Sequence, residues 1–300
     1  MTEIDHPRFG IALRILSGAL FAGMIICAKA VSEDVPLGEI VFFRSAFAMI
    51  PLILFLWLRG EFPQGLATKR PIGHLIRASF GTLALFASFA AIARLNVAEA
   101  VLIAQVSPIL MALAAVVLLR EQLTAWRIGG LVLGFAGVVV MVWPELGQSG
   151  ADTARLVGFF LTVLSATLGA IALIMVRSLN RTESPGAIAL YFVLATMIGA
   201  LLTLPWGWMM PSGWTLVLLI GAGLFGGMAH IAMTLAFRYA PATRLAPFEY
   251  LALLWPILAD LLIFRLHLST SFLFALPLIL LGAAIAAAEK DKAEAIPATR

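Results

Sequence analysis

The chain has 300 residues, of which 62% are hydrophobic and 12% charged, with a formal net charge of +4. Because soluble domains carry about one-quarter charged residues, this composition excludes an ordinary soluble enzyme and indicates a membrane protein. The basic residues are scattered among apolar segments and form no basic face, so no nucleic-acid partner is expected. A single cysteine, Cys27, excludes an internal disulfide. No CxxC or HExxH spacing points to a metal or redox centre, so we expect no cofactor.

Apolar runs recur along the chain at the length, about 20 residues, that a helix needs to cross a hydrocarbon core. We predict ten transmembrane helices and no strands, which makes the fold class all-α integral membrane. The predicted spans are about 11–31, 37–58, 75–93, 98–119, 127–143, 155–177, 186–206, 214–237, 244–265 and 270–288. The N-terminal residues hold acids and a proline instead of the basic lead of a cleavable signal peptide, so the first span is expected to remain.

The basic residues predict the orientation of these spans, because cytoplasmic loops carry an excess of Lys and Arg. The larger group, expected in the cytoplasm, comprises Arg8, Arg14, Arg59, Lys69, Arg70, Arg77, Arg120, Arg127, Arg177, Arg181, Arg238, Arg244, Lys290, Lys292 and Arg300. The smaller group comprises Lys29, Arg94, Arg155 and Arg265. We therefore expect a multi-pass protein of a bacterial-type inner membrane with both termini in the cytoplasm, as an even number of spans requires.

Weak internal similarity recurs at an offset of 145 residues. FGTLA at 80–84 resembles FGGMA at 225–229, REQLT at 120–124 resembles RLHLS at 265–269, and Gly137 falls on Gly282. A unit of five spans has an odd count, so the second copy must cross the bilayer in the opposite sense. The sequence therefore predicts two inverted five-helix repeats around a central cavity.

Inverted repeats are typical of secondary transporters that work by alternating access, with the substrate near the midplane between the halves. A pair of proline-interrupted spans in corresponding positions marks such a site. Pro108 and Pro256 are the candidate helix breaks, although Pro108 lies twelve positions before Arg120 and Pro256 nine before Arg265.

The chain resembles the drug/metabolite transporter (DMT) superfamily, with two copies of the EamA domain. The resemblance rests on the ten spans, the inverted halves, Arg44 inside span two, and SPILMALAAVVLLREQLT at 107–124, which is similar to a fourth-span pattern that ends in a Glu. The second copy departs from it, with Leu266 where Glu121 would be matched. The resemblance implies EamA-like repeats at 1–146 and 147–289 and a cytoplasmic tail at 290–300. Within the superfamily the sequence is most similar to YddG-type exporters of aromatic and other neutral amino acids.

Four ionisable residues lie inside predicted spans, where each costs about 2.5–3.5 kcal/mol unless it has a partner or water. Arg44 and Asp260 lie at similar depth, about 10 Å from the external side. We expect them to form an ion pair or a gating network there; alternatively, Arg44 snorkels outward and Asp260 reaches Arg265. Glu249 and His230 lie nearer the cytoplasmic ends. Either could face the pathway and exchange protons, whereas the simpler alternative gives Glu249 a basic neighbour and His230 a carbonyl.

Polar and aromatic side chains near the two prolines supply a candidate substrate site. Gln105 and Ser107 precede Pro108, which leaves an upstream carbonyl without its N–H partner, and Tyr250 falls on Gln105 at the repeat offset. Trp255 lies mid-span, whereas the other tryptophans lie at span ends. Stacking on an aromatic substrate would need walls such as Phe86, Trp255, Tyr250 and Met24, although core packing explains each of them as well.

Helical spacing places further polar residues on two faces. Ser79, Thr82 and Phe86 share one face of span three, and His230 and Thr234 share one face of span eight. Both faces are predicted to line the cavity; the alternative is interhelical hydrogen bonding, worth about 0.6 kcal/mol on average in membranes. Gly130 and Gly134 in span five, with Gly282 in span ten, predict close helix packing, either internal or in a weak dimer.

The sequence favours a secondary transporter that exports small amphipathic metabolites, most of all amino acids including aromatic ones. The same scaffold would also suit other metabolites or drugs, such as nucleosides and cationic compounds. The sequence has no GxxxxGK[ST] loop, so we do not expect the chain to hydrolyse ATP. A membrane-embedded enzyme would need a cluster of catalytic groups at one interface, and a channel would need polar residues along a continuous pore.

Overall fold

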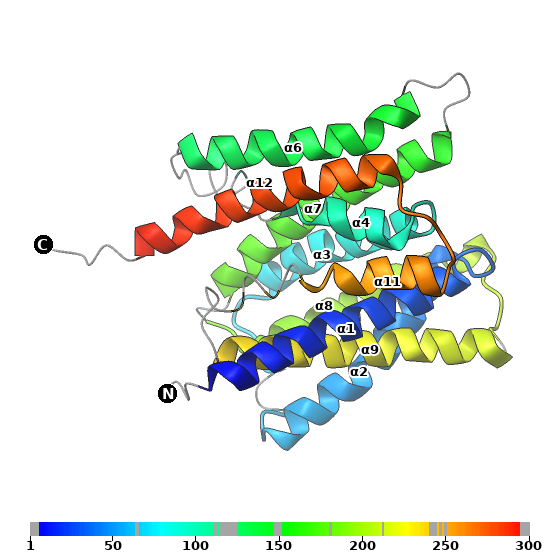
Figure 1. The fold of residues 1–300 in the computed structure, drawn as a ribbon. Coiled ribbons are helices and arrows are strands. Elements are labelled where there is room, and N and C mark those ends of the chain that lie inside the picture. Colours follow the sequence, from blue (N-terminus) through cyan, green and yellow to red (C-terminus); the bar gives the residue numbers. More distant parts are fainter. Residues whose placement is uncertain are drawn as a thin grey trace, which may run out of the picture.

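The computed structural model describes residues 6–63, 66–107, 109–110, 113, 125–146, 152–179, 182–211, 213–239, 245, 248 and 251–294, and these residues form helices and connections without a strand (Figure 1). The helices are α1 (Pro7–Val31), α2 (Leu37–Leu58), α3 (Pro71–Ile92), α4 (Val97–Ala104), α6 (Ala125–Leu146), α7 (Thr153–Leu179), α8 (Pro185–Leu201), α9 (Gly213–Tyr239), α11 (Leu254–Leu262) and α12 (Thr270–Glu294), with a short 3-10 turn, η2 (Leu204–Trp206).

Five of these helices are long and apolar enough to cross a membrane: Arg8–Val31, Leu37–Leu58, Pro71–Ile92, Thr153–Val176 and Gly213–Ala236. Three shorter apolar helices cover Ile128–Pro144, Pro185–Leu201 and Thr270–Ile285. The prediction of an all-helical, multi-pass membrane protein is thus confirmed. Predicted spans four and nine extend into residues outside the described ranges, so the structure covers them only in part.

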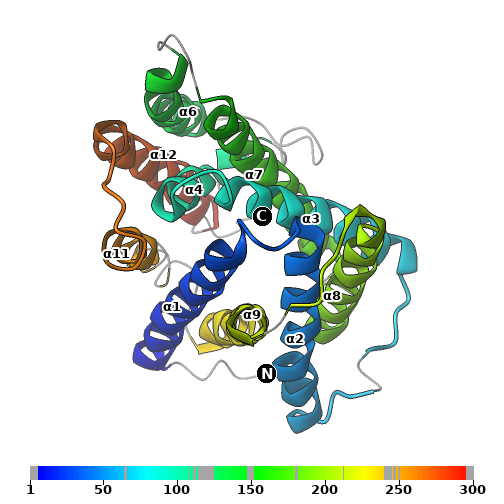
Figure 2. The same cartoon turned by 90° about the vertical axis from the view of Figure 1, so that its right-hand side faces the viewer.

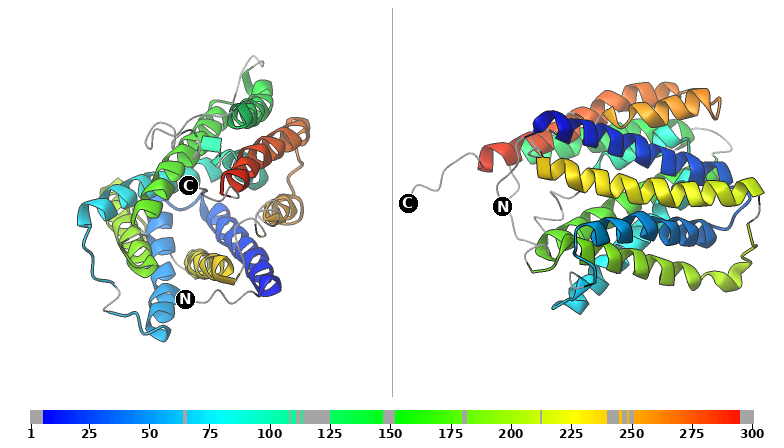
Figure 3. Two further views of the ribbon diagram at one scale, coloured as in Figure 1. Left: turned by 90° about the vertical axis from the view of Figure 1, so that its left-hand side faces the viewer. Right: turned by 90° about the horizontal axis from the view of Figure 1, so that it is seen from below.

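The helices run along one common direction, and consecutive helices alternate in sense (Figures 1 and 3). The start of α1 and the end of α12 lie at the same end of the bundle, which we call the terminal end; the α1–α2 connection lies at the opposite end. An even number of crossings requires this arrangement.

The short helices α4 and α11 each have one end at an interruption, and a proline follows that interruption by about one turn. The interruption ends α4 and precedes α11. The ring of a proline clashes with the carbonyl four residues before it. In line with this rule, α4 ends at Ala104, four residues before Pro108, although Pro108 itself lies outside the described residues. In span nine, Ala252 and Leu253 form a turn and α11 starts at Leu254, so Pro256 lies in its first turn. The predicted break at Pro256 therefore falls in a turn four residues upstream.

Helix packing divides the bundle into a central group and a flanking pair. In the centre, α9 packs between α1 and α2, α3 packs on α7 and α8, and α2 packs on α8 (Figure 2). At the side, α6 packs along α12. A Cβ added at Gly282 would lie 2.7 Å from the carbonyl oxygen of Gly130 and 2.6 Å from the amide nitrogen of Gly134. The predicted small-residue contact thus serves internal packing of α6 on α12.

Candidate functional site

The side chain of Arg44 lies in the interior of the bundle. Only 2% of Arg44 is exposed, although it carries a charge and sits on the apolar helix α2. Its Nε lies 3.5 Å from the sulfur of Met24 on α1, and its Nη2 lies 3.5 Å from Nε2 of His230 on α9. Because a guanidinium only donates, Nε2 must accept, which requires the neutral His230 tautomer with its proton on Nδ1. Three helices therefore meet at Arg44.

A close approach of α2 and α9 creates this contact. A Cβ added at Gly223 would lie 2.9 Å from the carbonyl oxygen of Arg44 and 3.1 Å from the amide nitrogen of Ala48, so no larger residue fits without moving backbone. From sequence, Arg44 and His230 were placed toward opposite ends of the membrane. They meet because the long arginine side chain spans the intervening depth.

His230 keeps an accessible surface within the bundle. His230 is exposed. Its ring nevertheless lies edge-on to the ring of Phe21 of α1, with ring centroids 5.0 Å apart, and it contacts Arg44 of α2. Thr234, one turn further along α9, is exposed as well and donates a hydrogen bond to the carbonyl of His230 over 2.8 Å. The imidazole of His230 is therefore accessible although side chains of α1 and α2 contact it, so a transported molecule could reach it.

A second arginine, Arg77 of α3, lies near the same place. Its guanidinium carbon is 4.0 Å from the centroid of the Phe192 ring on α8, a cation–π contact. Its Nε and Nη1 atoms are buried and have no hydrogen-bond partner. Arg77 and Arg44 both act electrostatically on His230. The interior is thus lined by two guanidinium groups and a neutral imidazole.

The predicted ion pair between Arg44 and Asp260 is not formed. Asp260, on α11, is fully buried and accepts hydrogen bonds from the backbone N–H groups of Val97 (3.1 Å) and Ala98 (2.7 Å). These are the first residues of α4, whose N–H groups have no partner within the helix and whose dipole favours a negative charge. Asp260 therefore caps a helix, and the pairing prediction was wrong because it compared depth alone.

Further polar contacts fasten the end of the bundle opposite the terminal end. Glu99 of α4 accepts hydrogen bonds from Arg155 of α7 at 3.1 and 3.2 Å. Lys29 near the end of α1 donates to the carbonyls of Ile92 (2.8 Å) and Leu95 (3.1 Å) after α3. Helices that are distant in the sequence are thus tied together at this end.

At the terminal end, a carboxylate joins the α2–α3 connection to the start of α8. Glu183 accepts hydrogen bonds from His74 Nε2 (3.3 Å) and the backbone N–H of Lys69 (3.1 Å). The ring of Tyr191 lies 4.6 Å from that of His74 and its hydroxyl donates to the carbonyl of Leu66 over 3.1 Å. Burial alone would raise the pKa of Glu183, but hydrogen bonds from Thr68, His74 and the Lys69 N–H, with the charge of His74, lower it below its ordinary value.

This shift predicts a pH dependence of stability. A carboxyl group whose pKa is lowered by folding stabilises the fold above its unfolded pKa, about 4.3 for Glu, and loses that contribution as the pH falls through the lower folded pKa. We therefore expect Glu183→Gln to lower the melting temperature of the detergent-solubilised protein at pH 7, with the difference from wild type shrinking below about pH 4. Glu33→Gln, at an exposed position of the α1–α2 connection, is the control. A constant difference across this range would contradict the account.

The other predicted site residues are dispersed. Thr82 Oγ1 lies 3.1 Å from Thr196 Oγ1 of α8, and Phe86 lies 4.0 Å from a Cβ added at Gly199, so both face α8. For Thr82, the structure thus has the interhelical hydrogen bond that was the alternative. Ser79 is exposed, Gln105 and Ser107 are half-buried after α4, and half-buried Trp255 lies beside Gly18 of α1. Glu249, Tyr250 and Pro108 lie outside the described residues.

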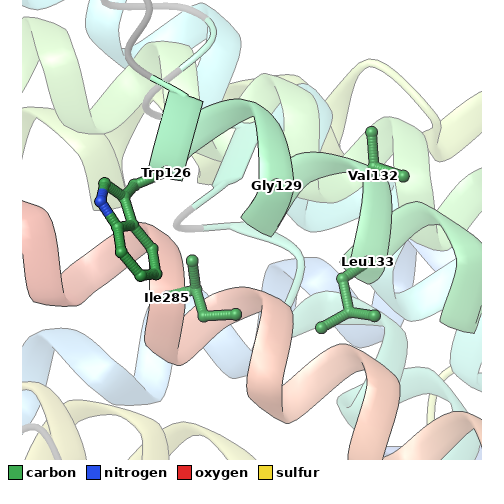
Figure 4. A pocket seen from close by; sticks show the side chains of 5 residues that line it. All are labelled: Trp126, Gly129, Val132, Leu133 and Ile285. Carbon is green, nitrogen blue, oxygen red and sulfur yellow. The ribbon is translucent and has the colours of Figure 1, made fainter.

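A cavity of about 470 Å³ lies away from these residues, between α6 and α12 (Figure 4). Its lining is almost wholly apolar and is formed by Trp126, Gly129, Val132, Leu133 and Ile285. Because Trp126 and Val132 are exposed, this cavity opens on the outer surface of the helix bundle. It offers no polar group that would orient a substrate. Within the described ranges, no group of three or more His, Cys, Asp or Glu residues could hold a metal ion.

Sequence reasoning missed the polar residues near helix ends. Arg77 was counted among the cytoplasmic basic residues and His74 and Glu183 were not singled out, because a hydropathy pattern does not show the direction of a side chain. One signal for Arg77 is Gly81 four residues later, since a glycine there leaves room for a long side chain to run along the helix.

Comparisons with known proteins agree with this fold. Residues 8–143 match the EamA-like transporter family. A riboflavin transporter of Rhizobium johnstonii is 29% identical over 265 residues, 87% of this chain and 85% of the relative. The pseudopaline exporter CntI of Pseudomonas aeruginosa is 28% identical over 264 residues, covering 84% and 86%. An S-adenosylmethionine uptake transporter of Rickettsia felis is 29% identical over 233 residues, covering 75% and 74%.

A crystal structure of a protein that is 21% identical in sequence superposes with a TM-score of 0.66 over 95% of this chain and 99% of that one, which shows a shared fold. The family model over residues 8–143 and these three relatives are named for transporters, so the chain is similar to membrane transporters of small molecules.

Proposed function

We propose that the chain is a secondary transporter that moves small amphipathic molecules by alternating access between two inverted halves, residues 1–146 and 147–289. The observation that carries the proposal is the contact between Arg44 and His230 inside an apolar helix bundle, where the imidazole remains accessible. Ionisable groups inside a membrane mark a substrate or ion pathway by default.

The helix pairing supports the inverted repeat. If α1, α2, α3, α4 and α6 correspond to α7, α8, α9, α11 and α12, then the contact of α1 with α9 should recur as that of α7 with α3. Both contacts exist. Likewise α2 packs on α9 as α8 packs on α3, and α4 packs on α7 as α11 packs on α1. Helices α2 with α8, and α6 with α12, then pack across the pseudo-twofold axis.

Single residues follow the same relation. A Cβ at Gly38, near the start of α2, would clash with Thr203 after α8, and a Cβ at Gly186, near the start of α8, would clash with Leu56 at the end of α2. The α2–α8 contact is therefore tight at each end through a glycine in the equivalent place. Such repetition is what two copies of one packing unit produce.

Two carboxylates at opposite ends of the bundle make contacts that the inverted repeat relates to each other. Glu39, in the first turn of α2, accepts a hydrogen bond from the N–H of Met209 between α8 and α9 over 3.1 Å. Glu183, just before α8, accepts one from the N–H of Lys69 between α2 and α3 over 3.1 Å. Each carboxylate therefore joins one half to a connection of the other. In our proposal, these contacts loosen in turn as the site opens to each side.

For the substrate, we propose amino acids, including aromatic ones, carried outward across an inner membrane with both chain termini in the cytoplasm. Arg44, His230 and Met24 meet in the interior, and Trp255 beside α1 is the residue that we propose for stacking. Exporters of other metabolites or drugs are the alternative, since the relatives are named for riboflavin, pseudopaline and S-adenosylmethionine and differ in direction.

Counterflow in proteoliposomes tests the proposed function. Vesicles with the purified chain are loaded with an unlabelled amino acid, nucleoside or drug cation, and uptake of the labelled compound is followed. A carrier gives a transient, saturable overshoot that depends on the internal load. A linear, non-saturable flux would indicate a channel, and a chemical change in the compound would indicate an enzyme.

A further inference from the structure

We propose that Arg44 and Arg77, with His230 beside them, form a subsite for an anionic group of the substrate, a carboxylate or a phosphate. The inference deepens the proposed transport function and rests on it. It names a chemical feature of the cargo: a carboxylate or phosphate group attached to an apolar body.

The position of the Arg77 guanidinium places the subsite near the middle of the membrane. A Cβ added at Gly81 would lie 3.2 Å from Nη1 of Arg77, so the arginine side chain runs along α3 away from the terminal end. Gly81 lies ten residues after Pro71, where α3 begins. This corresponds to about 15 Å, half of a hydrocarbon core of about 30 Å. Arg77 therefore reaches mid-depth, where its guanidinium packs on Phe192.

Among the residues that the structure describes, the two guanidinium groups have no carboxylate partner. Arg44 contacts a thioether and an imidazole, and Arg77 contacts an aromatic face, while its Nε and Nη1 donate to nothing. In the part of the chain that the structure describes, no carboxylate lies within ion-pair distance of either arginine. A buried cation is strongly unfavourable without a partner or water. In the proposed subsite, this partner is an anion that enters with the substrate.

The donor groups fit an oxyanion. The guanidinium fork matches the geometry of carboxylate and phosphate groups through paired N–H donors. Two positive charges at this place also disfavour a cationic ligand. Neutral His230 holds one N–H of Arg44, and the ring of Phe21 lies against that imidazole, so the apolar part of the substrate has an aromatic surface beside the charge.

Pairs of probes that share an aromatic part and differ in whether they carry an anionic group test the subsite. Indole-3-acetate is compared with indole-3-acetamide, and phenyl phosphate with phenol, at millimolar concentration. Two readouts are used: the rise in melting temperature of the purified chain in detergent, and competition in the counterflow assay. The variants are Arg77→Gln and Arg44→Lys. Arg94→Gln is the control, because Arg94 is exposed just after the end of α3 and donates a hydrogen bond to the carbonyl of Ala90 in that helix.

The wild type should be stabilised by the acids and not by their neutral partners. Because Arg77→Gln removes charge-assisted hydrogen bonds, we expect it to lower the affinity for the acids about tenfold or more. The affinity for the neutral probes should not change. Arg94→Gln should match wild type. A response to the carboxylate alone, or to the phosphate alone, would identify which oxyanion the subsite takes.

Equal stabilisation by acids and neutral partners, or by none of the probes, would overturn the subsite. This comparison needs only wild type, so it decides the matter even if a variant fails to fold. Acid preference that persists in Arg77→Gln would overturn the role of Arg77. Counterflow without acid preference would refute the subsite and leave the transport function standing, whereas acid binding without any counterflow would refute transport alone.

Discussion

Replacing Asp260 by alanine should destabilise the protein by about 3 kcal/mol or more, because two hydrogen bonds to a charged group are lost and two buried N–H groups are left without acceptors. The carboxylate of Asp260 bonds the N–H groups of Val97 and Ala98 at 3.1 and 2.7 Å and is fully buried. Asp260→Asn should also destabilise, since its amide NH₂ turns a donor toward donors. The measurement is the melting temperature of the purified protein in detergent.

Asp152 supplies a matched control for Asp260. It also accepts hydrogen bonds from two N–H groups at a helix start, those of Ala154 (3.0 Å) and Arg155 (3.3 Å), but it is exposed. In Asp152→Ala water can replace the carboxylate, so the loss should be about 0.5–2 kcal/mol. Equal losses for the buried and the exposed aspartate would contradict the assignment of Asp260 as a buried cap that joins α11 to α4.

Replacing Gly223 by alanine should separate α2 from α9 and weaken transport together with stability. The new methyl group would lie 2.9 Å from the carbonyl oxygen of Arg44 and 3.1 Å from the amide nitrogen of Ala48, and backbone atoms cannot rotate away. Overpacking of this kind costs about 1–3 kcal/mol. The helix shift also acts where Arg44 contacts His230, so counterflow should fall in the fraction that remains folded.

Gly221→Ala is the control on the same helix. There the methyl group would lie 3.4 Å from the sulfur of Cys27, an ordinary contact, and alanine favours a helix over glycine by up to about 1 kcal/mol. Its stability should match or exceed wild type with counterflow unchanged. If both variants behave alike, the α2–α9 approach does not position Arg44.

The sequence predicted which side chains lie inside the membrane better than it predicted their partners. Arg44, His230 and Asp260 stood out because charged or polar groups are costly in apolar segments, and all three lie in the interior. Depth can be estimated from the residue count along a helix, but the direction of each side chain depends on packing. Arg44 therefore contacts His230 although the two residues were expected at different depths, and Asp260 accepts hydrogen bonds from the start of α4.

The helix breaks were predictable because a proline acts at a fixed distance. The interruptions at Ala104 and Ala252 follow from the clash with the carbonyl four residues before Pro108 and Pro256. The role of Arg77 was not predictable in the same way. Its position near a predicted span end matches a cytoplasmic charge equally well, and only the space at Gly81 and the ring of Phe192 turn the side chain inward.

The opposite orientation of the two halves is the central claim, and cysteine labelling tests it most directly. In a Cys27→Ala background, Asp34→Cys marks the α1–α2 connection and Thr182→Cys the α7–α8 connection, both exposed positions. A membrane-impermeant maleimide added to spheroplasts should label Asp34→Cys at once and Thr182→Cys only after permeabilisation. Labelling of both positions from the same side would contradict the inverted repeat and, with it, the proposed alternating access.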